Sequence, residues 1–156
     1  MGSKERERIL PVLNRAVRLF IADSSLHSQR VAERLGLHAT DMQFLNLLDL
    51  LGPTTPGVLA RWSGLSSGGV TVVLDRLEQA GFIRRSSNPT DRRSVLVGLV
   101  PGRQKKVTAG YESAQKQFRA IVAGFSDEEL ATVLRFFTAT AREPAPGLGK
   151  RDELAR

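Results

Sequence analysis

The chain of 156 residues is long enough to form one domain with a packed core, and its composition, 41% hydrophobic and 25% charged, is that of a soluble globular protein. It contains no cysteine, which excludes disulfides, thiolate metal sites and cysteine nucleophiles, and no apolar run as long as a membrane span. The formal net charge of +7 favours a polyanionic partner, which could be nucleic acid, an anionic membrane or an acidic protein.

The N-terminal part of the chain is predicted to be helical. Its first residues are charged and are not followed by the apolar segment of a secretory signal, so we expect a cytoplasmic location. Apolar residues repeat at helical spacing over residues 5–23, and we expect this helix to be interrupted at Ser24-Ser25, to resume over 29–35 and to stop at Gly36. The next helix, residues 40–51, is apolar on nearly all sides, which predicts that it lies at the centre of the core.

Two shorter helices, separated by a turn that contains a glycine, are predicted next. The first covers residues 56–62, the turn covers 63–65, and the second helix covers 66–80. Residues that favour helix ends stand at these boundaries: Thr54 or Thr55, then Ser66 or Ser67, as caps, and Gly81 as the stop. This arrangement is typical of a helix-turn-helix, although ordinary helical domains contain it too.

A basic β-hairpin follows the second of these helices. Residues 82–85 and 94–100 have strand-forming sequences, and the turn-forming run 86–91 lies between them. From residue 84 to residue 106 there are seven Lys or Arg residues and a single acid, Asp91. A helix and a positively charged hairpin are the parts that a protein needs to hold a DNA groove and its phosphates.

The C-terminal part is predicted to contain two further helices. One apolar stripe crosses residues 103–125, and Ser126 with Glu129 forms a capping box at the start of the last helix. The tail, residues 143–156, is rich in proline, glycine and charge, and we expect it to be mobile or weakly helical.

Several short motifs lie at characteristic distances from one another along the middle of the chain. They are Leu59-Ala60, Leu65-Ser66, Val70-Thr71, Leu74-Asp75-Arg76-Leu77-Glu78, Ala80-Gly81, Arg84-Arg85 and Asp91-Arg92-Arg93-Ser94-Val95. With these motifs, residues 36–102 resemble the winged helix-turn-helix regulators of the multiple-antibiotic-resistance (MarR) family. The flanking helices extend the resemblance to residues 5–142. Leu99-Val100-Pro101-Gly102 falls where the family usually has a Leu-Thr-x-x-Gly run.

The resemblance implies a single, mainly α-helical domain over residues 5–142 with a small β-hairpin wing. Residues 5–35 and 103–142 would be the dimerisation helices of an obligate homodimer, and 36–102 would be the DNA-binding lobe. The apolar stripes at 9–21 and 107–137 suit such an interface, whose expected anchors are Phe118, Phe125, Phe136 and Phe137. The alternative is that these stripes pack within one chain.

The resemblance also implies which residues read DNA bases. The base-facing positions of the helix at 66–80 correspond to Ser67, Gly68, Gly69, Thr71 and Val72. Only the two hydroxyl side chains can hydrogen-bond to bases, while Val72 can touch a thymine methyl. The glycines can allow close backbone approach, at about 1 kcal/mol each in helix stability. We therefore expect modest base discrimination from this helix.

The wing is expected to compensate. Arg93, held by Asp91 across the turn, would enter the minor groove, where arginine responds to groove width and negative potential. The alternative for this pair is a surface ion pair worth less than about 1 kcal/mol. The expected phosphate contacts are Arg92, Arg84, Arg85, Arg61, Thr54, Thr55 and Ser66, with Arg76 either reaching phosphate or supporting the wing through a salt bridge.

The expected partners are double-stranded DNA with a pseudo-palindromic operator, a second copy of the chain and, from the resemblance, a small effector between the first, second and fifth helices. His27 and His38 could line that pocket, although a lone histidine near a helix end is more often a cap or a satisfied polar residue. We expect no membrane partner, no cofactor and no metal site, and no catalytic motif is visible. The rival function is a helical dimeric protein-interaction module whose basic wing binds an acidic partner.

Overall fold

The computed structural model describes residues 3–140, so the predicted mobile tail at 143–156 lies outside the described residues. The contacts of the chain form two compact units that divide between Gln43 and Phe44. The single domain predicted over residues 5–142, with its dimerisation segments, stays a prediction. None of the helices in the described range combines the length and hydropathy that a membrane crossing requires.

The first helix is longer than its sequence suggested. α1 (Ser3–Arg34) is continuous over 32 residues, and the predicted interruption at Ser24-Ser25 is wrong. A serine inside a helix costs only about 0.5 kcal/mol relative to alanine, which is too little to break a helix that continues on both sides. The predicted stop is confirmed: Gly36 has φ +68°, and Leu37 N–H donates to the carbonyl of Ala32 at 2.9 Å, as in a Schellman ending.

α2 (Ala39–Leu51) contributes many of the buried side chains, as its apolar sequence predicted. Met42, Phe44, Leu45 and Leu48 are all buried. Leu50, in contrast, is 74% exposed, because even an almost wholly apolar helix turns one edge toward solvent.

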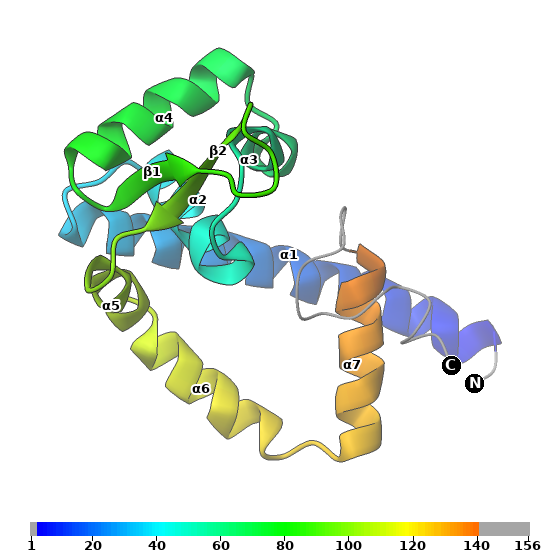
Figure 1. Cartoon of the computed structure of the whole chain (residues 1–156). Coiled ribbons are helices and arrows are strands. Elements are labelled where there is room, and N and C mark those ends of the chain that lie inside the picture. The colour runs from blue at the N-terminus through cyan, green and yellow to red at the C-terminus, as the bar shows by residue number, and fades with distance from the viewer. Residues whose placement is uncertain (1–2, 141–156) are drawn as a thin grey trace. The chain divides into compact units, whose positions relative to one another are not determined.

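The predicted winged helix-turn-helix is confirmed (Figure 1). It consists of α3 (Pro56–Ser63), α4 (Ser67–Gln79) and an antiparallel hairpin of β1 (Ile83–Ser87) and β2 (Val95–Leu99). α3 and α4 pack on each other, β1 packs on α4, and β2 packs on α3. The core among these elements contains Leu59, Val70, Leu74, Leu77, Ile83 and Val97.

The hairpin extends further toward its turn than predicted. The ladder runs from Ile83 opposite Leu99 to Ser87 opposite Val95, so Ser86 and Ser87 are strand residues and not turn residues. Backbone pairing does not require a strand-forming side chain, and it overrides the turn preference of serine here. A further bridge joins Thr54 to Val97, with N–H to carbonyl distances of 2.9 and 2.8 Å in the two directions.

The predicted helix over residues 103–125 is broken in the structure. α5 (Arg103–Ala109) and α6 (Glu112–Val122) are separated at Gly110-Tyr111. Glycine is a poor helix former, and the hydroxyl of Tyr111 accepts a hydrogen bond of 2.7 Å from the Asn46 side chain in α2, a contact that a local pattern does not predict.

The last helix, α7 (Asp127–Thr140), begins with the predicted capping box. Ser126 N–H donates to Glu129 Oε2 at 2.8 Å, and Glu129 N–H donates to Ser126 Oγ at 3.3 Å. Hydrogen bonding of the Glu129 carboxylate to Ser126, first to its backbone N–H and then to its side chain, holds the pKa of Glu129 below its ordinary value of 4.5.

Candidate nucleic-acid interface

The start of α4 is fixed by a serine cap. Ser66 is extended, and its Oγ accepts a hydrogen bond of 3.2 Å from Gly69 N–H, so the cap is Ser66 and not Ser67. One face of α4 buries Val70, Val73, Leu74 and Leu77. The helical repeat therefore turns another face to solvent, and the exposed residues at its N-terminal end are Ser67, Gly68, Thr71 and Val72.

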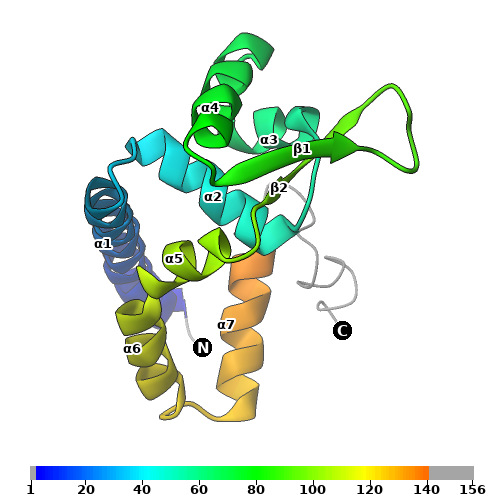
Figure 2. The ribbon, with the colours of Figure 1, turned by 60° about the vertical axis from the view of Figure 1, so that its left-hand side comes forward.

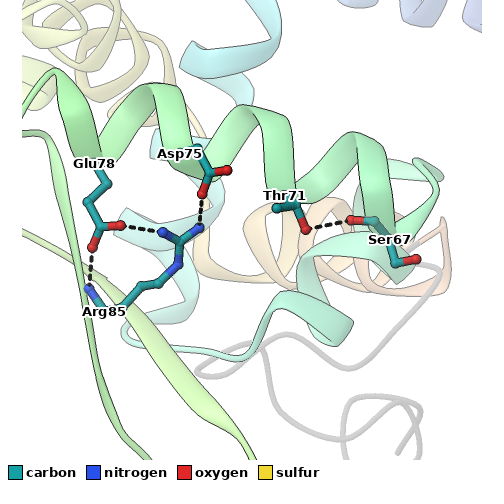
Figure 3. Close-up of polar contacts among 5 residues, drawn as sticks. All are labelled: Ser67, Thr71, Asp75, Glu78 and Arg85. Atoms are coloured by element: carbon teal, nitrogen blue, oxygen red, sulfur yellow. Dashed lines mark hydrogen bonds and ion pairs between the residues drawn. The ribbon is translucent and has the colours of Figure 1, made fainter.

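This exposed face has little side-chain hydrogen-bonding capacity. The Thr71 hydroxyl donates to the carbonyl of Ser67 at 3.0 Å, so its proton is used within the helix and its oxygen remains as an acceptor (Figure 3). A Cβ placed on Gly68 would meet no other atom within 4 Å, which shows that the space above this glycine is open. The exposed face therefore suits contact by shape and by the Val72 methyls more than a dense set of hydrogen bonds.

The end of α4 sets the path into the wing. Gly81 has φ +72°, and Phe82 N–H donates to the carbonyl of Leu77 at 2.9 Å, which together form a second Schellman ending. Two residues later the chain enters β1, with Ile83 buried, Arg84 exposed and Arg85 half-buried. The alternation of a strand thus places neighbouring arginines on opposite sides of β1.

Arg85 is held by two carboxylates of α4, as Figure 3 shows. Its Nη2 lies 2.6 Å from Asp75 Oδ1, its Nη1 donates to Glu78 Oε2, and its backbone N–H donates to Glu78 Oε1 at 3.2 Å. The hydrogen bond to Asp75, opposed by a smaller effect of burial and assisted by the charge of Glu78, raises the pKa of Arg85 above its ordinary value. Arg85 thus gives the wing salt-bridge support, a role that the sequence suggested for Arg76 and that stays a prediction for Arg76.

The turn of the wing is organised by Asp91. Its Oδ1 accepts a hydrogen bond of 2.9 Å from the backbone N–H of Arg93, and its carbonyl accepts one of 3.0 Å from Ser94 N–H. Asp91 therefore holds Arg93 through the main chain, which leaves the guanidinium of Arg93 at the surface. Arg92 beside it is also exposed, and Figure 2 shows the turn reaching away from α4.

The remaining predicted contact residues lie on α3, on α4 or next to them. Thr55 caps α3, because its Oγ1 accepts from Val58 N–H at 3.4 Å, while Thr54 pairs its backbone with β2. Arg61 is exposed and Arg76 is half-buried. The predicted residues thus lie on α3, α4 and β1, just before the two helices, and in the turn between β1 and β2.

Sequence reasoning missed Asp75 and Glu78 as parts of this region. They stand three residues apart, and so on one face of the predicted helix, shortly before the arginine pair of the first predicted strand. That spacing was the available signal.

His38 precedes α2, and its backbone N–H donates to Asp41 Oδ2 at 3.1 Å, which is a helix-start contact. Within residues 3–140, no three His, Cys, Asp or Glu side chains are grouped so that they could hold a metal ion.

Comparisons with known proteins agree with this geometry. The profile of the MarR family matches residues 37–95. The uncharacterized HTH-type transcriptional regulator YcgE of Bacillus subtilis (strain 168) is 33% identical over 111 residues, which are 71% of this chain and 72% of YcgE. YkoM of the same organism, also an uncharacterized HTH-type transcriptional regulator, is 30% identical over 128 residues, 82% of each chain.

Solved structures share the fold. A MepR mutant from a multidrug-resistant S. aureus clinical isolate superposes with a TM-score of 0.68 at 19% identity, covering 81% of this chain and 93% of that one. A mutant MarR from E. coli, crystallised with operator DNA, gives a TM-score of 0.55 at 23% identity, covering 85% and 94%. The chain therefore belongs to the MarR family of winged helix-turn-helix transcriptional regulators, as its B. subtilis relatives and the matched family profile show and as its fold agrees. This is a family of regulators and not of enzymes.

Proposed function

We propose that this protein is a homodimer that binds a pseudo-palindromic operator in double-stranded DNA and represses transcription until a small ligand releases it. The observation that carries the proposal is the pairing of an exposed helix face, formed by Ser67, Gly68, Thr71 and Val72 and sterically open above Gly68, with an exposed arginine turn at Arg92-Arg93. Both belong to one packed group of elements, as a protein that grips two adjacent grooves requires.

In this proposal α4 enters the major groove by its N-terminal half. Ser67 and Thr71 offer hydroxyl groups to base edges, Val72 offers methyl groups to thymine, and Gly68 and Gly69 let the helix backbone come close. The Arg93 guanidinium enters the minor groove, where it responds to groove width. Exposed Arg61, Arg84 and Arg92 contact phosphates, with Thr54, Thr55, Ser66 and Arg76 as further contacts.

The homodimer is supported by large apolar side chains that the described chain leaves uncovered. Phe20 on α1 is 60% exposed and Phe118 on α6 is 64% exposed, and no residue of α6 is buried. On α7 the rings of Phe136 and Phe137 are exposed and pack edge to face against each other. Exposed apolar side chains on helices of this kind mark interaction surfaces, and a second copy supplies a matching surface by symmetry.

Release by a small ligand follows from the geometry of a dimer on DNA. Two recognition helices must meet successive major grooves about 34 Å apart, so a ligand that favours another separation lowers the affinity for DNA. The ligand-relieved repression rests on this argument and on the family's mode of action.

The experiment is a selection from a pool of random-sequence duplexes with the full chain, combined with analytical ultracentrifugation. We expect enriched duplexes that share two inverted half-sites about ten base pairs apart, bound by a dimer. Failure to enrich any duplex, or loss of all binding when nonspecific DNA is added, overturns the proposal and favours an acidic protein as the partner of the wing.

A further inference from the structure

The wing meets the recognition helix through one polar cluster, formed by Arg85 of β1 with Asp75 and Glu78 of α4, which we call the Arg85 clamp (Figure 3). The Arg85 side chain is only 29% exposed, although arginines usually stay in solvent. It lies on the side of β1 opposite to exposed Arg84. The Arg85 side chain therefore lies against α4, whereas Asp75 stays at the surface with 61% of its side chain exposed.

The clamp uses donors that arginine alone can provide together. Two guanidinium nitrogens and the backbone N–H of Arg85 are bound by two carboxylates one helical turn apart. The planar guanidinium holds its donors in a fixed fork, whereas the single ammonium group of a lysine cannot bridge the same two carboxylates in that geometry. The contact therefore sets an orientation of β1 on α4 as well as a distance.

The charge of the clamp argues against a phosphate contact by Arg85. Asp75 and Glu78 contribute two negative charges and Arg85 one positive charge, so the cluster carries a net charge of −1. To contact phosphate, Arg85 would have to leave both carboxylates, which would then repel the same phosphate. Arg84 is exposed on the opposite side of β1, away from these two carboxylates, and can contact phosphate without disrupting their ion pairs with Arg85.

The wing needs a contact of this kind. It is a two-stranded ribbon, and such ribbons are marginally stable unless they pack on another element. The hairpin is anchored at its base by buried Ile83, while Arg85 lies further toward the turn, opposite Val97 at the middle of the ladder. At that level the Thr54–Val97 bridge holds β2, and Arg85 holds β1 against α4. A restraint at this point limits the swing of the turn that carries Arg93.

We propose that Arg85 is a positioning residue, which with Asp75 and Glu78 fixes the wing on the recognition helix so that α4 and the wing turn reach DNA in one set geometry. This inference rests on the proposed function. It reassigns Arg85 from contact with phosphate to control of the angle between the two reading elements, and it gives two acidic residues a part in DNA binding.

The test measures binding of a fluorescent duplex, selected by the unaltered protein from a random pool, over a range of KCl concentrations. The variants are Glu78→Gln, Arg85→Gln and their combination, with Arg84→Gln and Glu112→Gln as controls. Arg84 is the exposed neighbour of Arg85, and Glu112 is an exposed acid at the start of α6. Thermal unfolding of each variant is recorded alongside.

We expect Glu78→Gln to weaken DNA binding about ten-fold. Loss of a negative charge would by itself strengthen binding to DNA, so this direction of change distinguishes a positioning role from a simple charge effect. Arg85→Gln weakens binding about as much and leaves the slope of log K against log[KCl] unchanged, because no phosphate contact is lost. The combined variant binds no more weakly than Arg85→Gln, since both changes break one contact. Arg84→Gln makes the slope shallower by about 1.8 for a dimer, and Glu112→Gln does not weaken binding.

The inference is overturned if Arg85→Gln makes the slope shallower, as Arg84→Gln does, and Glu78→Gln binds at least as tightly as the unaltered protein. If Arg85→Gln unfolds, Arg85→Lys decides: a positioning role requires a loss of about ten-fold despite the retained charge, and near-normal binding refutes it. Binding by the unaltered protein is measured first, so failure of the proposed function is seen as absent binding before any variant is compared.

Discussion

The open space above Gly68 leads to a prediction in which protein stability and DNA affinity change in opposite directions. Gly68 is the second residue of α4, and a Cβ there would meet no other atom within 4 Å. Replacing glycine by alanine in a helix stabilises it by about 0.5–1 kcal/mol when nothing clashes. For a chain of this length, Gly68→Ala should raise Tm by about 1–4 °C.

The same methyl group should harm DNA binding. If α4 enters the major groove with its backbone close to the DNA, the new methyl occupies space that the DNA surface needs, and filling a packed contact typically costs about 1–3 kcal/mol. For each protomer of the dimer, that corresponds to a loss of about 5- to 150-fold in affinity, at about 1.4 kcal/mol for each factor of ten. The assay is anisotropy of the selected duplex at fixed salt, next to calorimetric unfolding.

Gly124→Ala is the matched control. Gly124 lies in the turn between α6 and α7, and a Cβ there would be 3.5 Å from the carbonyl of Ile121, an ordinary contact distance. It should leave DNA affinity unchanged. If Gly68→Ala binds DNA as tightly as Gly124→Ala, α4 does not approach DNA closely at this glycine. A fall in Tm for Gly68→Ala contradicts the steric reasoning itself.

Four further outcomes are expected. Arg93→Ala should weaken operator binding ten-fold or more without changing Tm, because Asp91 holds the main chain; unchanged affinity in a salt-matched gel shift removes the wing from the mechanism. With about six or more phosphate contacts, log K against log[salt] should fall with a slope of about −5 or steeper, and a shallow slope means that the arginines are only solvated. Ser66→Ala should cost about 1 kcal/mol through the lost cap, seen as a lower Tm in thermal unfolding, and an unchanged Tm refutes it. Because the pKa of Glu129 is below 4.5 in the folded chain, its capping contribution to stability is present above pH 4.5 and is lost as the pH falls through the lowered pKa. NMR titration of the Glu129 carboxyl, with Glu129→Gln as the variant that lacks this titration, tests the direction of the shift, and a pKa at or above 4.5 contradicts it.

The helix ends were predictable from the sequence because they depend on local chemistry. Thr55, Ser66 and Ser126 each accept a hydrogen bond from a backbone N–H three residues ahead, and Gly36 and Gly81 adopt the positive φ that favours glycine. The exposed face of α4 was likewise visible in the helical repeat of its apolar residues.

The misjudged features depend on energies or contacts that a local pattern does not contain. Ser24-Ser25 lowers helix propensity only slightly, and α1 continues through both serines because it is helical on either side of them. The break at Gly110-Tyr111 coincides with a hydrogen bond to Asn46, which is 65 residues away in sequence. The partners of Arg85 become evident only when β1 folds back on α4, because the sequence alone does not decide which of Arg84 and Arg85 faces the helix.

The bridge between Thr54 and Val97 has a mechanical consequence. It ties the segment before α3 to β2 of the two-stranded wing, and Gly98 permits this close approach, since a Cβ there would stand 3.3 Å from Pro53 Cγ. A displacement of β2 along its own axis would therefore pull the first turn of α3, and the reverse holds as well. The wing and the segment that enters α3 are thus mechanically linked. A shift of the wing that moves its proposed phosphate contacts away from DNA therefore also displaces Thr54 and Thr55, the proposed contacts before α3.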